Sequence, residues 1–178
     1  MLGDQVSQLL RVLVATHPPQ NILEIGTGVG YSGHILLDSA PATCQLHTIE
    51  LDEVRGQKAK EQFKNSGLAN RATVFIGDAR EIVPNLMPAM GLEFDIILMD
   101  GPKSCYKTFL PDFDRLLKKD GILICDNVLL KGNISGETEV KDSVIIRNMR
   151  AFLQDIQQPP WISSVLNIGD GISISIKK

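Results

Sequence analysis

Short apolar runs alternate with stretches of helical periodicity along most of this chain. Apolar runs bounded by polar or glycine-rich segments predict strands at residues 21–26, 44–50, 72–76, 94–100 and 121–127. Apolar positions at helical spacing predict helices at 4–16, 31–38, 52–66, 82–90 and 139–157, and another that follows a short turn and begins near Asp112. Such alternation of strand and helix is typical of a doubly wound parallel sheet with helices on both faces.

The C-terminal end breaks this alternation. The stretches WISSVLNI and ISISIKK predict two strands, and the Gly169-Asp170-Gly171 sequence between them is a hairpin turn signal. One edge of the sheet should therefore be antiparallel. The expected fold is α/β, with a seven-stranded, mostly parallel sheet in a single domain over residues 1–178.

Composition limits the classes of partner. The 178 residues, 43% apolar and 22% charged, fit one domain with a sizeable core. The net charge of −3 gives no general electrostatic reason to expect nucleic acid or a membrane as partner. No stretch approaches the roughly 20 apolar residues of a membrane span, and the early acid Asp4 is not typical of a signal peptide. Three cysteines without a CxxC pair predict reduced thiols and a cytoplasmic protein.

The stretch NILEIGTGVGYS, at residues 21–32, is the strongest local signal. A predicted strand contains Glu24, and glycines follow at positions 26, 28 and 30. Glycine lets backbone N–H groups approach a ligand closely, and a helix that begins there directs its positive end at the same point. A glycine-rich turn without a ligand is the alternative, but packing alone rarely requires three alternate glycines. We therefore expect a ligand at this turn.

Polar side chains also mark the ends of the later predicted strands. They are Glu50, Asp78, Asp100 and the pair Asp126-Asn127. Ligands of parallel sheets bind beyond the carboxyl ends of the strands, so these side chains should gather with Glu24 on one rim. Each could separately cap a helix or be solvated in a loop. Together, their mutual repulsion predicts a cationic ligand or a metal.

The spacing of Glu50 narrows the expected ligand. Glu50 lies 20 residues after Gly30, where it can accept hydrogen bonds from both hydroxyls of a ribose. Dinucleotide-binding proteins and S-adenosylmethionine (SAM) binders share this feature, but the dinucleotide fingerprint is G-x-G-x-x-G, whereas this chain has E-x-G-x-G-x-G. A carboxylate at Glu24 opposes a phosphate and suits the ammonium of SAM. SAM is thus the expected cofactor, and an NAD-dependent dehydrogenase is the weaker alternative.

A second group of polar residues predicts a metal. Asp100, Asp126 and Asn127 offer two carboxylates and an amide oxygen, which are hard ligands suited to Mg²⁺ or Ca²⁺. No set of cysteines and histidines has the spacing of a zinc site. Lys103 follows Asp100 by three residues, and an amine held beside a divalent cation is a candidate general base. A helix cap at Asp126, a turn at Asn127 and a surface lysine at Lys103 are the alternatives.

At this point the chain resembles a known family. The stretches LEIGTGVGYS, IE at 49–50, GDA at 77–79, DGPKSCY at 100–106 and CDNVLLKG at 125–132 are together similar to the cation-dependent O-methyltransferases of the catechol and caffeoyl-CoA type. The resemblance covers about residues 5–176, and its motifs occur in the family order. It implies the Rossmann-like fold of class I SAM-dependent methyltransferases.

The resemblance implies a role for each motif. The methionine part of SAM would be held at the glycine turn, by Glu24, Gly26, Thr27, Gly28, Tyr31 and Ser32. Glu50 would hold the ribose, and Asp78 with Ala79 the adenine. The divalent-cation ligands would be Asp100, Asp126 and Asn127. Asp100 would also contact the cofactor, and Lys103 would be the catalytic base. Mg²⁺ is the expected ion, ahead of Mn²⁺ or Ca²⁺.

Two features depart from the family pattern. The family usually has some tens of mostly helical residues before the first helix seen here, which help to cover the substrate site and often form a dimer interface. In this chain only about 20 residues precede the first strand, so the N-terminal helical region is short or truncated. Gly101-Pro102 and Ser104-Cys105 replace the more usual residues around Lys103, whereas Tyr106 is retained.

The expected activity is transfer of a methyl group from SAM to a hydroxyl of a small, catechol-like substrate whose neighbouring oxygens bind the metal. Methylation of a hydroxylated nucleoside in tRNA is an alternative, which the acidic composition disfavours. A non-catalytic SAM-binding protein is another. The resemblance is also compatible with a homodimer.

Overall fold

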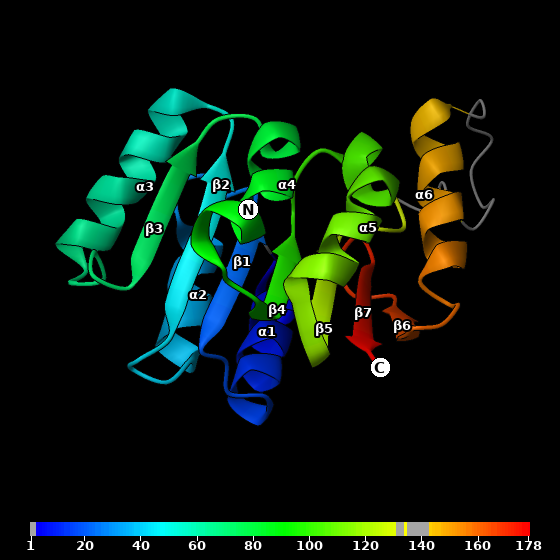
Figure 1. Cartoon of the computed structure of the whole chain (residues 1–178), viewed down its shortest axis with the longest axis horizontal. Coiled ribbons are helices and arrows are strands. Elements are labelled where there is room, and N and C mark those ends of the chain that lie inside the picture. The colour runs from blue at the N-terminus through cyan, green and yellow to red at the C-terminus, as the bar shows by residue number, and fades with distance from the viewer. Residues whose placement is uncertain (1–2, 131–133, 135–142) are drawn as a thin grey trace.

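The computed structural model describes residues 3–130, 134 and 143–178 (Figure 1). Its strands are β1 Asn21–Ile25, β2 Gln45–Glu50, β3 Ala72–Ile76, β4 Phe94–Met99, β5 Leu117–Asp126, β6 Trp161–Leu166 and β7 Ile172–Lys177. They form one seven-stranded sheet in the order β3-β2-β1-β4-β5-β7-β6. Neighbouring strands from β3 to β5 pair in parallel, and β7 pairs antiparallel with both β5 and β6. The predicted mostly parallel sheet with an antiparallel C-terminal hairpin is confirmed.

Helices cover both faces of this sheet, as predicted. They are α1 Asp4–Thr16, α2 Tyr31–Ser39, α3 Glu53–Asn65, α4 Ala79–Met90, α5 Tyr106–Leu116 and α6 Val144–Asp155, with a short 3₁₀ helix, η1, at Lys103–Cys105. The first three helices share a core with one face, which includes Leu10, Ile35, Phe63, Ile22, Ile96 and Ile124. The last three share a core with the other face, which includes Val83, Phe113, Phe152, Leu23, Ile97 and Leu123. Adjacent strand residues thus serve opposite cores.

The helix after β4 begins earlier than predicted. The proline at position 111 suggested a start near Asp112, but η1 leads directly into α5 at Tyr106, and Pro111 lies inside the helix. One face of α5 is buried along its whole length, through Tyr106, Phe109, Phe113 and Leu116. Burial of such side chains is worth roughly 1.5–3 kcal/mol each, which outweighs the cost of about 3 kcal/mol for an interior proline.

The next strand also begins early. Strand β5 starts at Leu117 rather than at residue 121, because Leu117 pairs with Phe94 across the sheet. The register then shifts, and Ile122 pairs with Ile96. Asp120, within the extra residues, takes the left-handed conformation with φ 63°. The predicted strand at 121–127 was therefore right in its buried half and missed the exposed half.

Other element boundaries differ less. Helix α4 begins at Ala79, three residues before the predicted start at 82, and the β6–β7 hairpin has the predicted glycines in a longer loop. The predicted start of the last helix, at 139, lies outside the described residues. Within the described ranges, no helix is both long and apolar enough to cross a membrane.

The turn after β1 is held against the end of β4. The N–H of Asp100 donates to the carbonyl of Ile25 at 2.9 Å, and Gly26 follows with φ 103°. A Cβ atom at position 26 would lie 2.3 Å from the carbonyl oxygen of Asp100. Gly28 also has a positive φ, 56°, but a Cβ there would meet nothing within 4 Å. Glycine is thus required at 26 for close approach and at 28 only for conformation.

This difference gives a matched pair of substitutions. We expect Gly26→Ala to lower the free energy of unfolding by about 3 kcal/mol or more, since strain at positive φ adds to a backbone clash that costs roughly 1–3 kcal/mol. Gly28→Ala should cost only the conformational part, about 1–2 kcal/mol. Urea unfolding of both variants without ligand measures the difference. Equal losses would contradict the close approach described above.

Candidate active site

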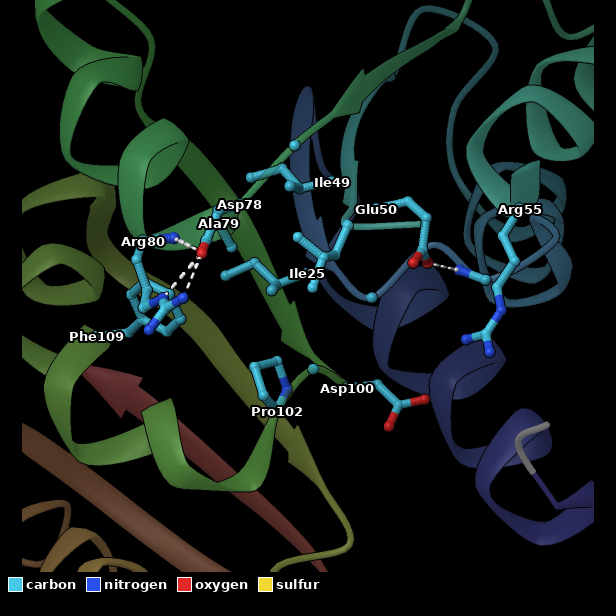
Figure 2. Close-up of a pocket in the computed structure, with 15 residues that line it drawn as sticks. Ile25, Ile49, Glu50, Arg55, Asp78, Ala79, Arg80, Asp100, Pro102 and Phe109 are labelled. Atoms are coloured by element: carbon cyan, nitrogen blue, oxygen red, sulfur yellow. Dashed lines mark hydrogen bonds and ion pairs between the residues drawn. The ribbon is translucent and has the colours of Figure 1, made fainter. Parts of the chain in front are cut away.

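The site lies where the order of the strands reverses. From β1 the chain first adds β2 and β3 on one side, then crosses to add β4 and β5 on the other. The carboxyl ends of β1 and β4 therefore border a crevice, which is the usual place for a ligand in such sheets. A cleft of about 370 Å³ occupies it, lined by residues that include Glu50, Asp78, Asp100 and Phe109 (Figure 2). We call this the main cleft.

A smaller cleft of about 260 Å³ adjoins it at the glycine turn. Its lining consists of Gly26, Thr27, Gly28, Val29, Tyr31, Ser32, Arg55 and Asp100. We call this the side cleft. The residues predicted to hold a cofactor therefore divide between the two. Thr27, Tyr31 and Ser32 line the side cleft, whereas Glu50, Asp78 and Ala79 line the main cleft. Gly26 and Gly28 line both clefts, and Glu24 lines neither.

Glu50 is fixed by two backbone groups. Its Oε2 accepts a hydrogen bond from the N–H of Gly28 at 2.7 Å, and its Oε1 accepts one from the N–H of Asp52 at 2.9 Å. The side chain is 7% exposed and still lines the main cleft. A carboxylate oxygen can accept more than one hydrogen bond. Glu50 is therefore held in place at the cleft with capacity to accept further hydrogen bonds, and its contact with a ribose stays a prediction.

Glu24 lies beneath the glycine turn and is fully buried. Its Oε2 accepts a hydrogen bond from the Thr48 hydroxyl at 2.6 Å, and the Thr27 hydroxyl lies 2.5 Å from that of Thr48. Its Oε1 has no partner among the described residues. Burial raises the pKa of Glu24 to about 7, against the effect of the neighbouring Ser32 and Thr48 hydroxyls. A buried carboxyl with an unused oxygen favours a cationic ligand above it.

Asp78 is paired with Arg80 at the far end of the main cleft. The Arg80 Nε donates to both carboxylate oxygens of Asp78 at 3.0 Å, and the Arg80 N–H donates to Oδ1 at 2.8 Å (Figure 2). These hydrogen bonds lower the pKa of Asp78. The predicted adenine residues Asp78 and Ala79 do line the cleft. The arginine partner was not predicted, although its place two residues after the aspartate is consistent with a local ion pair.

Strand register brings Asp100 and Asp126 together. Leu98 of β4 pairs with Ile124 of β5 and Met99 pairs with Cys125, so Asp100 and Asp126 each come directly after a paired residue. Asp126 is 4% exposed, and burial followed by the charge of Asp100 raises its pKa. Asn127 comes next, with φ 57°, and donates its N–H to Asp126 Oδ1 at 2.8 Å. The predicted metal ligands are thus neighbours.

This donor set fits a hard divalent cation. Two carboxylates and an adjacent amide supply only oxygen ligands, which Mg²⁺ and Ca²⁺ prefer, and they leave coordination positions open. Within the described ranges, no cluster of three or more His, Cys, Asp or Glu side chains could hold a metal. A cation at Asp100 and Asp126 would therefore need oxygens from Asn127, from a substrate or from water.

Lys103 joins this cluster through three contacts. Its Nζ lies 3.3 Å from Asp100 Oδ1, 3.0 Å from the Tyr106 hydroxyl oxygen and 3.3 Å from the Asp126 carbonyl oxygen. The three contacts match the three N–H groups of an ammonium. Tyr106 is fully buried, and its hydroxyl lies 2.7 Å from the same Asp126 carbonyl oxygen. The predicted base is therefore held beside the predicted metal ligands.

Three further residues of the site were not predicted. Thr48 binds Glu24 through its hydroxyl, Arg55 lines both clefts, and Asp170 of the hairpin loop lies close enough to raise the pKa of Asp126. Thr48 could have been found from its position two residues before Glu50 on the same face of the strand. Arg55 and Asp170 reach the site through tertiary structure, which no local sequence signal indicates.

The raised pKa of Glu24 gives a test in the absence of any ligand. Burial raises the pKa of Glu24 from its ordinary value of 4.5 to about 7, so the stability that Glu24 contributes is fully present below pH 4.5 and is lost as pH rises through 7. Replacement by neutral glutamine removes this loss. We expect Glu24→Gln to become more stable relative to the original chain by about 2.5 kcal/mol between pH 5 and pH 8. Urea unfolding at both pH values measures this, and a pH-independent difference would contradict it.

Comparisons with known proteins agree with this geometry. A family model described as O-methyltransferase matches residues 1–178. A catechol O-methyltransferase from Niastella koreensis is 28% identical over 77% of this chain and 62% of the relative, so the chain spans less than two thirds of that protein. One from Sus scrofa is 31% identical over 74% of this chain and 72% of the relative.

A solved structure shows the same fold. The O-methyltransferase from Bacillus cereus, in complex with SAH (S-adenosylhomocysteine), is 23% identical and has a TM-score of 0.92 over 100% of this chain and 83% of that chain. The family match spans every element described above, including the glycine turn, the paired aspartates and Lys103. This chain belongs to the O-methyltransferase family.

Proposed function

We propose that this chain is a SAM-dependent, divalent-metal-dependent O-methyltransferase that acts on a small substrate with two neighbouring oxygens, such as a catechol. The observation that carries the proposal is that Asp100 and Asp126 follow paired residues of β4 and β5, close enough for the charge of Asp100 to raise the pKa of Asp126, with Lys103 within hydrogen-bonding distance of Asp100. Asp100 also lines both clefts, so a metal there would lie beside the cofactor. The relatives named catechol O-methyltransferase support this substrate class.

The two clefts suit the two ends of SAM. Glu50 would accept the ribose hydroxyls, while Asp78 and Ala79 would meet the adenine, because all three line the main cleft. The side cleft would take the methionine end, above the buried Glu24. A ligand ammonium would favour the charged form of Glu24, whose Oε1 lacks a partner in the described structure. The Bacillus cereus relative solved with SAH supports a ligand of this kind.

The proposed metal ligands are Asp100, Asp126 and Asn127. A bound divalent cation supplies Lewis acidity, which lowers the pKa of an acceptor hydroxyl. The protein would contribute position, since the pairing of β4 with β5 brings the strand ends that bear both aspartates together. Two oxygens of a vicinal diol would match the open coordination positions. Most of the rate enhancement would then come from orientation and charge stabilisation.

Lys103 is the proposed general base. In the structure its Nζ donates to Asp100 Oδ1 at 3.3 Å. A cation bound at Asp100 would compete with Lys103 for this carboxylate and so release the amine toward an acceptor hydroxyl. The Tyr106 hydroxyl lies 3.0 Å from Nζ and would keep it in place. Nζ could then accept the proton from the acceptor hydroxyl.

The metal ligand Asp126 provides the main test of the proposal. Asp126→Asn keeps the shape of the side chain and removes one charge. Because loss of even an outer-shell partner of a metal typically costs 10–100-fold, we expect metal-dependent methyl transfer by this variant to fall by about 100-fold or more. SAM binding by calorimetry should change little. Transfer is measured with labelled SAM over diphenols, phenolic acyl-CoA esters and bulk tRNA, with Mg²⁺ or with a chelator.

Asp120 offers a matched control on the same strand. Asp120 is exposed at the opposite end of β5 and pairs with Lys178, and asparagine tolerates its positive φ. Asp120→Asn should therefore keep full activity. Undiminished transfer by Asp126→Asn in the presence of chelator would show that the metal mechanism is wrong. Transfer to tRNA and to none of the small substrates would be compatible with the metal mechanism, but the acceptor would then be tRNA and not a catechol.

Lys103 can be tested separately from the metal. We expect Lys103→Gln to lower kcat by about 10²–10⁴-fold, the usual contribution of a general base, while Mg²⁺ and SAM still bind. Lys107→Gln is the control, because Lys107 is exposed and pairs with Asp155 on α6. Steady-state kinetics and calorimetry measure both effects. A variant that lost SAM binding together with kcat would not support a role as base.

A further inference from the structure

Arg55 is a charged residue of the site to which the proposed function gives no role. It lies in the first turn of α3, where its backbone N–H donates to the N-cap Asp52 at 2.9 Å. Its side chain is exposed and lines both the main cleft and the side cleft. In Figure 2 it lies beyond Glu50, on the side away from Asp78 and Arg80. Arg55 therefore faces the methionine end of the proposed ligand.

The two arginines of the site differ in their partners. The guanidinium of Arg80 is engaged by Asp78. The guanidinium of Arg55 has no hydrogen bond or ion pair with any residue that the structure describes. Among the described residues that line the side cleft, Arg55 is also the one with a positive charge. An unpaired guanidinium at a cleft is available to bind an anion.

The remaining charge in and below the side cleft is acidic. Asp100 lines it, and Glu24 is buried beneath the turn that forms it. These acids suit an ammonium or a sulfonium, but the amino-acid end of SAM also has a carboxylate, which they repel. Helix α2 begins at this cleft without a side-chain cap, so its first N–H groups can interact with the ligand carboxylate. The partial positive charge of a helix N-terminus would offset only part of the carboxylate charge.

We propose that Arg55 binds the carboxylate of the methionine moiety of SAM. The inference rests on the proposed function, because it takes the side cleft to be the site of that moiety. The guanidinium and the first turn of α2 would share the carboxylate, while the ammonium faces the acids. Arg55 would thereby make the site selective for a complete amino-acid end over a simple amine.

The test compares two ligands that differ by one group. Decarboxylated SAM keeps the adenosine, the sulfonium and the ammonium but lacks the carboxylate. We expect Arg55→Gln to weaken SAM binding about tenfold, which corresponds to ~1.4 kcal/mol, and to change the affinity for decarboxylated SAM less than twofold. Arg55→Lys, which keeps the charge but not the planar fork, should recover part of the loss. Titration calorimetry at low ionic strength measures all the affinities.

Lys58 is the matched control for this variant. It is also exposed on α3, one turn after Arg55, and it lines a neighbouring surface groove with His34 and Gln62 rather than either cleft. Lys58→Gln should change neither affinity by more than twofold. Equal weakening by Lys58→Gln would mean that the general charge of α3, and not contact with Arg55, attracts the ligand, and would overturn the proposal.

The outcomes separate this inference from the proposed function. If the original chain binds both ligands and Arg55→Gln weakens both equally, or weakens neither, the role of Arg55 is wrong and the cofactor assignment stands. If the original chain binds neither ligand, the cofactor assignment fails, and the role of Arg55 fails with it. Loss of affinity for SAM but not for decarboxylated SAM in Arg55→Gln supports both the cofactor assignment and the role of Arg55.

Discussion

The contact between the turn at Gly26 and the backbone of Asp100 holds the two halves of this site together. The glycine turn follows β1, and Asp100 follows β4, more than seventy residues later in the chain. The absence of a side chain at 26 lets the turn lie against the Asp100 carbonyl, where a Cβ would be only 2.3 Å away. The glycine turn and Asp100 therefore line one crevice. Both the main cleft and the side cleft depend on this contact.

Crowded carboxylates at that crevice show where a ligand must supply charge. Asp78 is balanced by Arg80, and Glu50 accepts hydrogen bonds from two backbone N–H groups. Glu24 and Asp126 are the acids whose pKa is raised, mainly by burial. The protein thus only partly offsets the free-energy cost of burying the charged forms of Glu24 and Asp126. An ammonium above Glu24 and a divalent cation at Asp126 are the groups that would offset the remainder.

Much of this fold could be predicted from the sequence, because its strands are short apolar runs that end in glycine or acid. The run FDIILM at 94–99 and the turn at 26–30 had few alternative interpretations. The predictions failed where tertiary packing overrides local preference. Pro111 sits inside α5 because one face of that helix is buried, and β5 extends to Leu117 because Phe94 offers it a partner. Neither partner is visible in the local sequence.

For the site, too, local sequence signals located some residues, whereas others depended on tertiary structure. Residues that end strands, such as Glu50 and Asp126, could be placed on one rim by topology alone. The pairing of Asp100 with Asp126 required the strand register, and the reach of Arg55 required the position of α3. Sequence reasoning therefore identified Lys103 and the acids at the strand ends but missed the two arginines, Arg55 and Arg80. Long arginine side chains are hard to assign in advance, because their charged end lies far from the backbone that the pattern predicts.

Tyr106 connects the buried core to the polar groups at the ends of β4 and β5. Its ring is buried and meets the ring of Phe152, on α6, edge to face with centroids 5.6 Å apart. Its hydroxyl reaches the carbonyl oxygens of Met99 and Asp126, at the ends of β4 and β5, and also accepts a hydrogen bond from Lys103. Because the aromatic ring cannot move without disturbing the core, the two strand ends and the amine hold a fixed relative position. The relative position of Lys103 and the two strand ends is thus maintained by packing in the core on one face of the sheet.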